Sequence, residues 1–308
     1  MVAGKRREMG LGGYPDVTLA DARRRARERE KVNKGLDPPN RIWARRVTID
    51  AMRVLVLALL AAAFSALGAD TLLIDIPAGP FRMGSERGPA DERPAHEIVL
   101  PAFSIERVPV SNAQFAEFLN RAGPRSADGA RYFDDDDRDA RIHRVEGRWV
   151  ADRGYEAHPV VEASWRGAAA YCASLGRRLP TEAEWEKAAR GTDGRRYPWG
   201  DAPPDASRAR FAAGYNQTVP VGSFPAAASP YGVLDMAGNV WQWVSSLYRP
   251  YPYRAEDGRE DPGDSGVRGT RGGGHDWGAE EITVMQRGSR LSRAPGAGHH
   301  NIGFRCAR

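Results

Sequence analysis

The chain has 308 residues, a formal net charge of +5 and a hydrophobic share of 41%. Residues 1–50 carry 13 Lys/Arg and 7 Asp/Glu, a net of +6, so the remaining residues carry a net of −1. The basic charge therefore belongs to the N-terminal segment, and the rest lacks the positive excess typical of nucleic-acid binding. The 34 Gly and 22 Pro predict many turns and a modest amount of regular secondary structure.

The N-terminal segment, residues 1–51, contains the pattern of a short strand and a basic helix. Thr18 and Asp21 fit a capping box, and Gly35 fits the end of the helix. A solvated, charged helix is one interpretation. The stretch KRREMGLGGYPDVTLADARRRAREREKVNKGLDPP also resembles the N-terminal arm of tyrosine-recombinase integrases. Because nothing resembling a recombinase catalytic domain follows, we interpret residues 1–51 as a basic remnant that is not part of the mature protein.

Residues 52–69, MRVLVLALLAAAFSALGA, have the layout of a secretory signal peptide. Arg53 begins the segment, an uncharged apolar run follows, and small residues precede Asp70, so cleavage is expected after Ala66 or Ala69. The run is short for a membrane span, and a buried core helix is the alternative. A cleaved signal predicts a periplasmic or secreted protein, whereas an uncleaved one would anchor the chain to a membrane.

Residues 70–308 form the expected working domain. Capping residues and apolar spacing predict three helices: SNAQFAEFLNRAG at 111–123, SWRGAAAYCASLG at 164–176 and TEAEWEKAARG at 181–191. The apolar face of the first is expected to extend to Ala122, and that of the second to Leu175. Short strands are expected within residues 72–85 and 96–110. The combination predicts an α+β fold with much irregular backbone.

Eight motifs follow one another in this domain: IPAGPFRMGS (76–85), VPVSNAQFAEFL (108–119), HPVVEASW (158–165), RLPTEAEWEKAARG (178–191), YPWGD (197–201), YGVLDMAGNVWQW (231–243), RGG (271–273) and NIGFRCAR (301–308). Together they resemble the formylglycine-generating enzyme, or sulfatase-modifying factor, family. The resemblance implies a formylglycine-generating-enzyme fold, a compact C-type-lectin-like architecture that is low in regular secondary structure. Proteins with one fold perform many functions, so the site residues have to decide the function.

The resemblance also implies where a catalytic site would lie. Catalytic family members hold Cu(I) with two cysteine thiolates after the RGG motif, and those positions are Trp277 and Ile282 here. The Ser that follows RGG in such members is replaced by Gly274. Cu(I) favours soft thiolate ligands, which neither an indole nor an aliphatic side chain provides. We therefore expect no copper, and we interpret RGGGHDWGAEEI as a degenerate catalytic strand that can serve as a pocket wall.

Neighbouring side chains offer an alternative metal site. His275, Glu281 and His299 could form a His/carboxylate set for Fe(II) or Zn(II), if they converge. A structural or solvent-facing role is the competing interpretation of the histidines.

Two cysteines are present, Cys172 and Cys306. The resemblance implies that they form a disulfide, and export would supply the oxidising compartment that such a bond needs. Closing a loop of this length is worth about 4–5 kcal/mol in the chain-entropy model.

Oxygen ligands suggest calcium at one place. By resemblance, DMAGNVWQW supplies Asp235 and Gln242 side-chain oxygens and the carbonyls of Gly238 and Val240. Gln242 replaces the usual Glu, which removes one negative charge; a turn held by Asp235 hydrogen bonds is the alternative.

A second pattern matches EF-hand offsets at Asp135, Asp137, Asp139, Ile142 and Glu146. There Ala140 occupies the glycine position, so we interpret this stretch as a solvated acidic loop.

The sequence thus favours an exported member of this family that lacks the copper-binding cysteine pair and binds a ligand or partner: a peptide, a glycan or a protein. The alternative is an oxidoreductase of the same family with a His/carboxylate metal site. Conversion of a sulfatase cysteine to formylglycine is the third hypothesis. We expect no nucleic-acid partner for the mature domain, and membrane contact only through an uncleaved signal segment.

Overall fold

The computed structural model describes residues 72–288 and 295–308. The expectations for the N-terminal segment and the signal peptide therefore lie outside the described residues. All described residues belong to one compact unit of the chain, which extends to Arg308. Within the described residues, no helix has the length and apolar character needed to cross a bilayer.

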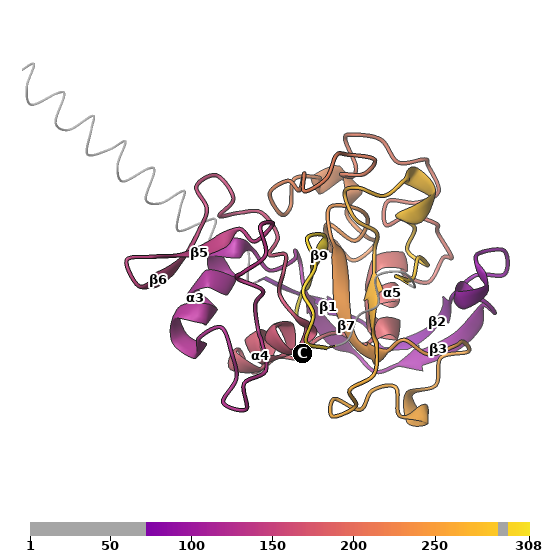
Figure 1. The fold of residues 1–308 in the computed structure, drawn as a ribbon. Coiled ribbons are helices and arrows are strands. Elements are labelled where there is room, and N and C mark those ends of the chain that lie inside the picture. Colours follow the sequence, from indigo (N-terminus) through magenta and orange to yellow (C-terminus); the bar gives the residue numbers. More distant parts are fainter. Residues whose placement is uncertain (1–71, 289–294) are drawn as a thin grey trace, which may run out of the picture. The chain divides into compact units, whose positions relative to one another are not determined.

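Short antiparallel pairs and one three-stranded sheet make up the β structure (Figure 1). The pairs are β1 (Leu73–Ile76) with β4 (Phe103–Glu106), β2 (Gly79–Met83) with β3 (His96–Leu100), and β5 (Ile142–Val145) with β6 (Arg148–Ala151). The sheet has the order β8 (Arg268–Arg271), β7 (Trp241–Leu247), β9 (Ile302–Gly303). In it, β7 runs antiparallel to β8 and parallel to β9.

Three α-helices lie where the sequence predicts them. They are α3 (Asn112–Ala122), α4 (Trp165–Ser174) and α5 (Glu182–Arg190). Four short 3-10 turns complete the regular structure: η1 (Ala90–Glu92), η2 (Pro225–Ala227), η3 (Ala255–Asp257) and η4 (Ala279–Glu281). Helices and short strands thus confirm the α+β class, and long irregular connections link them.

Capping side chains explain where the helices begin. Ser111 accepts from the backbone of Gln114, whose side chain bonds back to Ser111, and Thr181 and Glu184 form the same reciprocal box. The predicted apolar faces are correct except in the last turns. Ala122 is exposed and Leu175 is 40% exposed, because these turns extend beyond the core.

The core is assembled around the three-stranded sheet. On one side, α3 and α4 contribute aromatic and aliphatic side chains that meet Trp241, Trp243 and Phe304. On the other side, α5 contacts β2, β7 and β8 and buries Trp185. The edge of α5 that faces β8 carries carboxylates as well as apolar residues, and this edge supports the candidate site described below.

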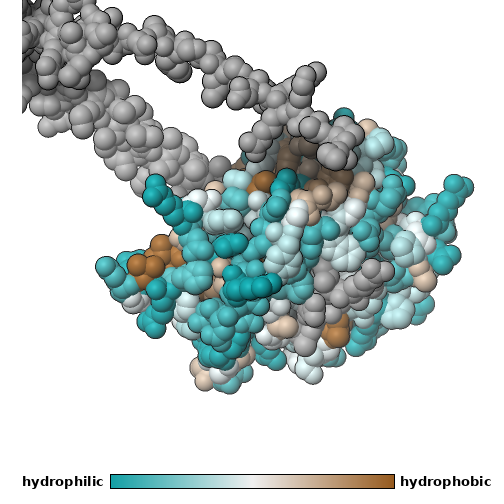
Figure 2. Space-filling model, turned by 45° about the horizontal axis from the view of Figure 1, so that its top comes forward, coloured by the Kyte–Doolittle hydropathy of each residue, from teal (hydrophilic) through white to brown (hydrophobic). Residues whose placement is uncertain are grey.

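The surface in Figure 2 is mainly hydrophilic, with apolar residues in small separate patches. The large apolar side chains that are exposed are scattered along the chain: Leu72, Val99, Val145, Val150, Leu175, Tyr215 and Val267. Single exposed apolar residues are normal on soluble domains, so these positions indicate no docking surface by themselves.

Candidate functional site: a cleft beside Trp277

The segment after β8 turns sharply, because Gly272 and Gly273 have φ angles of 98° and 75°. A Cβ on Gly273 would lie 2.6 Å from the carbonyl oxygen of Glu281, so this position also needs the close approach that only glycine allows. After the turn, the backbone N–H of His275 donates to the carbonyl oxygen of Asn239 at 2.9 Å, so the segment lies beside the residues that precede β7. Trp277 and Ile282 leave this segment in different directions.

Trp277 is half-buried and packs edge-to-face on Trp241, with ring centroids 5.1 Å apart. Ile282 is fully buried in a separate apolar cluster with Tyr197, Ala209 and Ala237. Neither side chain has an atom that can bind Cu(I). The position of Ile282 is thus part of the core, whereas Trp277 lines a cleft.

The cleft has a volume of about 510 Å³, within the range of small-molecule and peptide pockets. One wall is the loop from Ser85 to Glu92. The other lining residues are Arg196, Trp277, Glu280, Glu281, Thr283, Met285, Gln286 and Arg287. Its charged lining residues are Arg87, Asp91, Glu92, Arg196, Glu280, Glu281 and Arg287. The lining carries both signs of charge, which suits a polar ligand.

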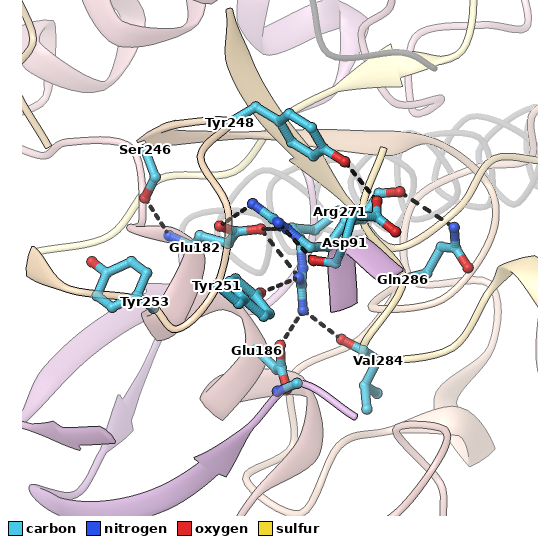
Figure 3. A network of polar contacts seen from close by, with 12 residues as sticks. Asp91, Glu182, Glu186, Ser246, Tyr248, Tyr251, Tyr253, Arg271, Val284 and Gln286 are labelled. Atoms are coloured by element: carbon cyan, nitrogen blue, oxygen red, sulfur yellow. Dashed lines mark hydrogen bonds and ion pairs between the residues drawn. The ribbon is translucent and has the colours of Figure 1, made fainter. Parts of the chain in front are cut away.

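A buried ionic network lies directly behind this cleft (Figure 3). Arg271 is fully buried and donates to Glu182 at 3.2 Å, to the Tyr251 hydroxyl at 3.1 Å and to Glu186. Arg287 donates to Glu182 at 2.7 and 3.1 Å. Although burial opposes ionisation, Arg287 and Arg271 hold the pKa of Glu182 below its usual value. Glu182 is therefore held in its ionised form, and both Glu182 and Glu186 are ion-paired to Arg271.

The network also fixes the cleft wall. Arg287 donates to the carbonyl oxygen of Asp91 at 2.7 Å, and the Tyr248 hydroxyl donates to the Asp91 carboxylate at 2.6 Å. Glu186 accepts from the backbone N–H of Gly84 at 2.8 Å. The loop that forms one wall is thus attached to α5 by charge-assisted hydrogen bonds, which are about twice as strong as neutral ones. Sequence reasoning missed this role of Arg287.

The structure does not bring His275, Glu281 and His299 together as a metal site. Within the described residues, the one group of three metal-capable side chains within 4.8 Å of one another lies elsewhere. Glu281 accepts from the N–H of Gly278 at 3.1 Å, and His299 shares a 2.7 Å hydrogen bond with Asn301. The alternative metal site predicted from the sequence is therefore not assembled.

His275 is nevertheless unusual. It is fully buried, and its Nδ1 lies 2.9 Å from the Asn239 carbonyl oxygen, which can only accept, so Nδ1 carries the proton. Burial lowers the pKa of His275, so the ring is neutral, and its Nε2 has no hydrogen-bond partner among the described residues. Next to it, hydrogen bonds from His300 and Asn301 lower the pKa of Asp276 to about 2 against the effect of burial.

The group of three metal-capable side chains consists of Asp137, Asp139 and Glu162. Asp139 is buried and accepts hydrogen bonds from Tyr215 and Asn216, and Glu162 is also buried. The interpretation of this stretch as a solvated loop was therefore wrong for Asp139. No pattern in the sequence indicates that Glu162, more than 20 residues away, lies beside Asp139.

The predicted calcium ligands fit the ion only in part. Asp235 is buried, its Oδ2 accepts from the N–H of Gly222, and its Oδ1 has no partner among the described residues, which suits a cation. Gln242 does not fit. Its Oε1 accepts from Trp185 at 2.9 Å and from Arg305 at 2.7 Å, which occupies both lone pairs. The set of predicted calcium ligands is therefore reduced to the Asp235 carboxylate and the backbone carbonyls of Gly238 and Val240.

Calcium binding at Asp235 predicts a metal-dependent melting temperature. At ten times the Kd, a ligand adds about 1.4 kcal/mol to the stability of the folded state, or about 3–6 °C in Tm for a domain of this size. We expect such a rise in about 5 mM CaCl2 relative to EGTA, given a weak extracellular-type site, and we expect Asp235→Asn to abolish it. Equal melting curves of the wild type in both buffers would contradict the site.

The two cysteines are joined in the structure. Cys172 on α4 and Cys306 after β9 form a disulfide between Cα atoms 5.5 Å apart, and both residues are fully buried. No free cysteine occurs in the described residues. The bond attaches the C-terminal strand to the helical side of the core.

Comparisons with known proteins agree with this architecture. Residues 65–308 match the family described as sulfatase-modifying factor enzyme 1-like domain, and residues 1–42 match the arm DNA-binding domain. A formylglycine-generating enzyme of Streptomyces coelicolor is 35% identical over 280 residues, covering 76% of this chain and 88% of that protein. The structure of PvdO from Pseudomonas aeruginosa aligns with a TM-score of 0.58 at 27% identity, covering 77% of this chain and 93% of the other.

A serine/threonine-protein kinase pkn1 of Chlamydia caviae is 38% identical over 245 residues, covering 77% of this chain. The chain spans only 38% of that kinase's length. The match therefore concerns one part of the kinase and says nothing of phosphoryl transfer here. The family match covers most of the chain, including every element of the fold. The chain belongs to the sulfatase-modifying factor enzyme 1-like family.

Proposed function

We propose that this chain is an exported binding module of its family, in which the cleft beside Trp277 holds a ligand and cysteine oxidation has been lost. The observation that carries the proposal is the separation of the two positions that correspond to the cysteine pair. Ile282 is sealed in the core, whereas Trp277 presents an aromatic ring to a cleft of about 510 Å³.

The cleft has the features of a recognition site. An aromatic side chain offers a large contact area at low cost in conformational entropy, and charged groups of both signs can orient a peptide, a glycan or a segment of a partner protein. The wall is held by the buried network, so it is formed before a ligand arrives. Export is part of the proposal because residues 52–69 have the layout of a signal peptide.

The loss of cysteine oxidation has a direct test. A peptide that carries the sulfatase cysteine motif is incubated with the purified chain, copper and oxygen, and aldehyde is measured by mass spectrometry. We expect no aldehyde, because the two cysteines of the chain are joined in a buried disulfide and Trp277 and Ile282 supply no thiolate. The S. coelicolor relative serves as the positive control. Aldehyde formation by this chain would overturn the proposal.

Binding is tested with peptide and glycan arrays probed by the labelled protein. Signals that depend on the cleft are expected to disappear in Trp277→Ala and to remain in Tyr215→Ala. Tyr215 is a matched control, because it is an exposed aromatic side chain that does not line the cleft. An array signal that survives Trp277→Ala places recognition elsewhere on the chain.

A further inference from the structure

One side chain of the cleft stands apart from the others. Glu92 ends η1 and lines the cleft, yet the residue is only 3% exposed. Within the part of the chain that the structure describes, its carboxyl group accepts no hydrogen bond and forms no ion pair. Neither carboxyl oxygen is among the enclosed atoms that lack a partner, so both can be reached from the cleft. Burial of the residue makes ionisation of the carboxyl costly, so a donor that enters the cleft would stabilise the carboxylate.

The backbone makes room for this carboxyl at the cleft wall. A Cβ on Gly88 would lie 2.4 Å from Oε2 of Glu92 and 3.1 Å from the side chain of Ser85. Gly88 and Ser85 both line the cleft. The carboxyl group of Glu92 is therefore seated in the wall in a space that any other residue at position 88 would fill.

Charges around the cleft leave an acidic excess. Arg196 is paired with Glu280, and Arg287 is paired with Glu182 behind the wall. Asp91, Glu92 and Glu281 remain without a cationic partner among the described residues, against the exposed guanidinium of Arg87. A bare metal ion does not fit, because the described residues place their group of three metal ligands elsewhere and the cleft is far larger than an ion.

From this geometry we propose that the cleft takes an organic cation, a primary amine or a guanidinium such as a lysine or arginine side chain, which donates to the Glu92 carboxylate. The inference rests on the proposed binding function and names the ligand class. Trp277 lines the same cleft, and its ring face is attractive to cations. Because the Glu92 carboxyl lies against Gly88, it defines the position in the cleft at which the cationic group of the ligand would bind.

The proposal predicts a pH dependence. Burial, followed by the Coulomb effects of Asp91 and Glu186, raises the pKa of Glu92 to about 7, while Arg271 and Arg287 act in the opposite direction. A cation binds the ionised form, so affinity rises with pH through this range. For a pKa of about 7, binding is expected to be about tenfold tighter at pH 8 than at pH 6.

The test measures binding of Nα-acetyl-arginine amide by calorimetry, with the neutral Nα-acetyl-glutamine amide and the anionic Nα-acetyl-glutamate amide as comparison probes. We expect only the cationic probe to bind, and we expect Glu92→Gln to weaken it at least tenfold at pH 8 and to abolish the pH dependence. Glu97→Gln, which neutralises an exposed carboxylate outside the cleft, is expected to bind like the wild type.

Glu92→Gln is expected to fold. A carboxyl with a raised folded-state pKa contributes stability at low pH that is lost as pH rises through 7, and the amide avoids that loss. Gly88→Ala provides a second variant, because its methyl group displaces the carboxyl and should weaken the cationic probe similarly.

The outcomes separate the two proposals. Tighter binding of the anionic or neutral probe, or unchanged binding in Glu92→Gln, overturns the inference while leaving a binding cleft in place. Cationic binding that depends on Glu92 but survives Trp277→Ala supports the inference and contradicts the role given to Trp277. An absence of binding by all three probes contradicts the inference, whereas the array signals test the binding module independently.

Discussion

Replacing Arg271 by Leu is expected to destabilise the domain by about 3–5 kcal/mol, the range for breaking a buried ion pair by removing one partner. Arg271 is fully buried between Glu182 and Glu186, and it also donates to the Val284 carbonyl oxygen at 2.8 Å. Without Arg271, the buried side chain of Glu186 loses an ion-pair partner. Urea unfolding followed by tryptophan fluorescence should show a lower midpoint with an unchanged m-value.

The matched control is Arg82→Leu. Arg82 pairs with Glu86 on the surface, where the two side chains are 61% and 59% exposed. Exposed pairs contribute about 0–1 kcal/mol, so this variant should unfold almost like the wild type. Equal destabilisation by the two substitutions would show that the buried network is not a stabilising feature of the native state.

The decrease in unfolding free energy caused by Arg271→Leu should also depend on pH. Without the guanidinium, the buried carboxylate of Glu182 loses one of the two arginines that lower its pKa, and a higher carboxyl pKa makes the folded state relatively more stable at low pH. The difference in unfolding free energy between variant and wild type is therefore expected to be smaller at pH 5 than at pH 8. A difference that grows on acidification would contradict the ionic character of the network.

Removing the disulfide is expected to cost about 5 kcal/mol, because the bond closes a loop with a sequence separation of 134 residues. The double variant Cys172→Ala/Cys306→Ala is compared with the wild type by thermal unfolding, with and without reductant. The variant and the reduced wild type should melt at similar, lower temperatures. The variant itself should not respond to reductant, which controls for other effects of the reagent. An unchanged melting temperature in the variant would contradict the expectation.

The sequence predicts the regular elements well where local chemistry determines them. The boxes at Ser111 and Thr181 mark the starts of α3 and α5 because capping uses residues three positions apart. The burial of the last helical turns is predicted less well, since Ala122 and Leu175 fit the apolar spacing but lie past the neighbouring elements. Where a helix leaves the core depends on its packing partners, which spacing does not reveal.

Sequence patterns predict less of the candidate site than of the helices. The resemblance locates Trp277 and Ile282 in the sequence, but it does not reveal that one side chain lines a cleft and the other is part of the core. Glu92 lies in an ordinary acidic stretch, ADERP. That its carboxyl lacks an ion-pair partner and lies against Gly88 depends on the path of the loop, which the sequence does not reveal. Arg287 reaches Glu182 over 105 positions of sequence, a contact that no local pattern predicts.

The attachment of the cleft wall to α5 has a consequence for the kinetics of association. Gly84 and Asp91 are tied to Glu186 and Arg287, so the loop between them has little conformational freedom to lose when a ligand docks. Complex formation should therefore resemble a rigid encounter, with an association rate that hardly varies among related compounds. Differences in affinity between these compounds would then arise mainly from their dissociation rates.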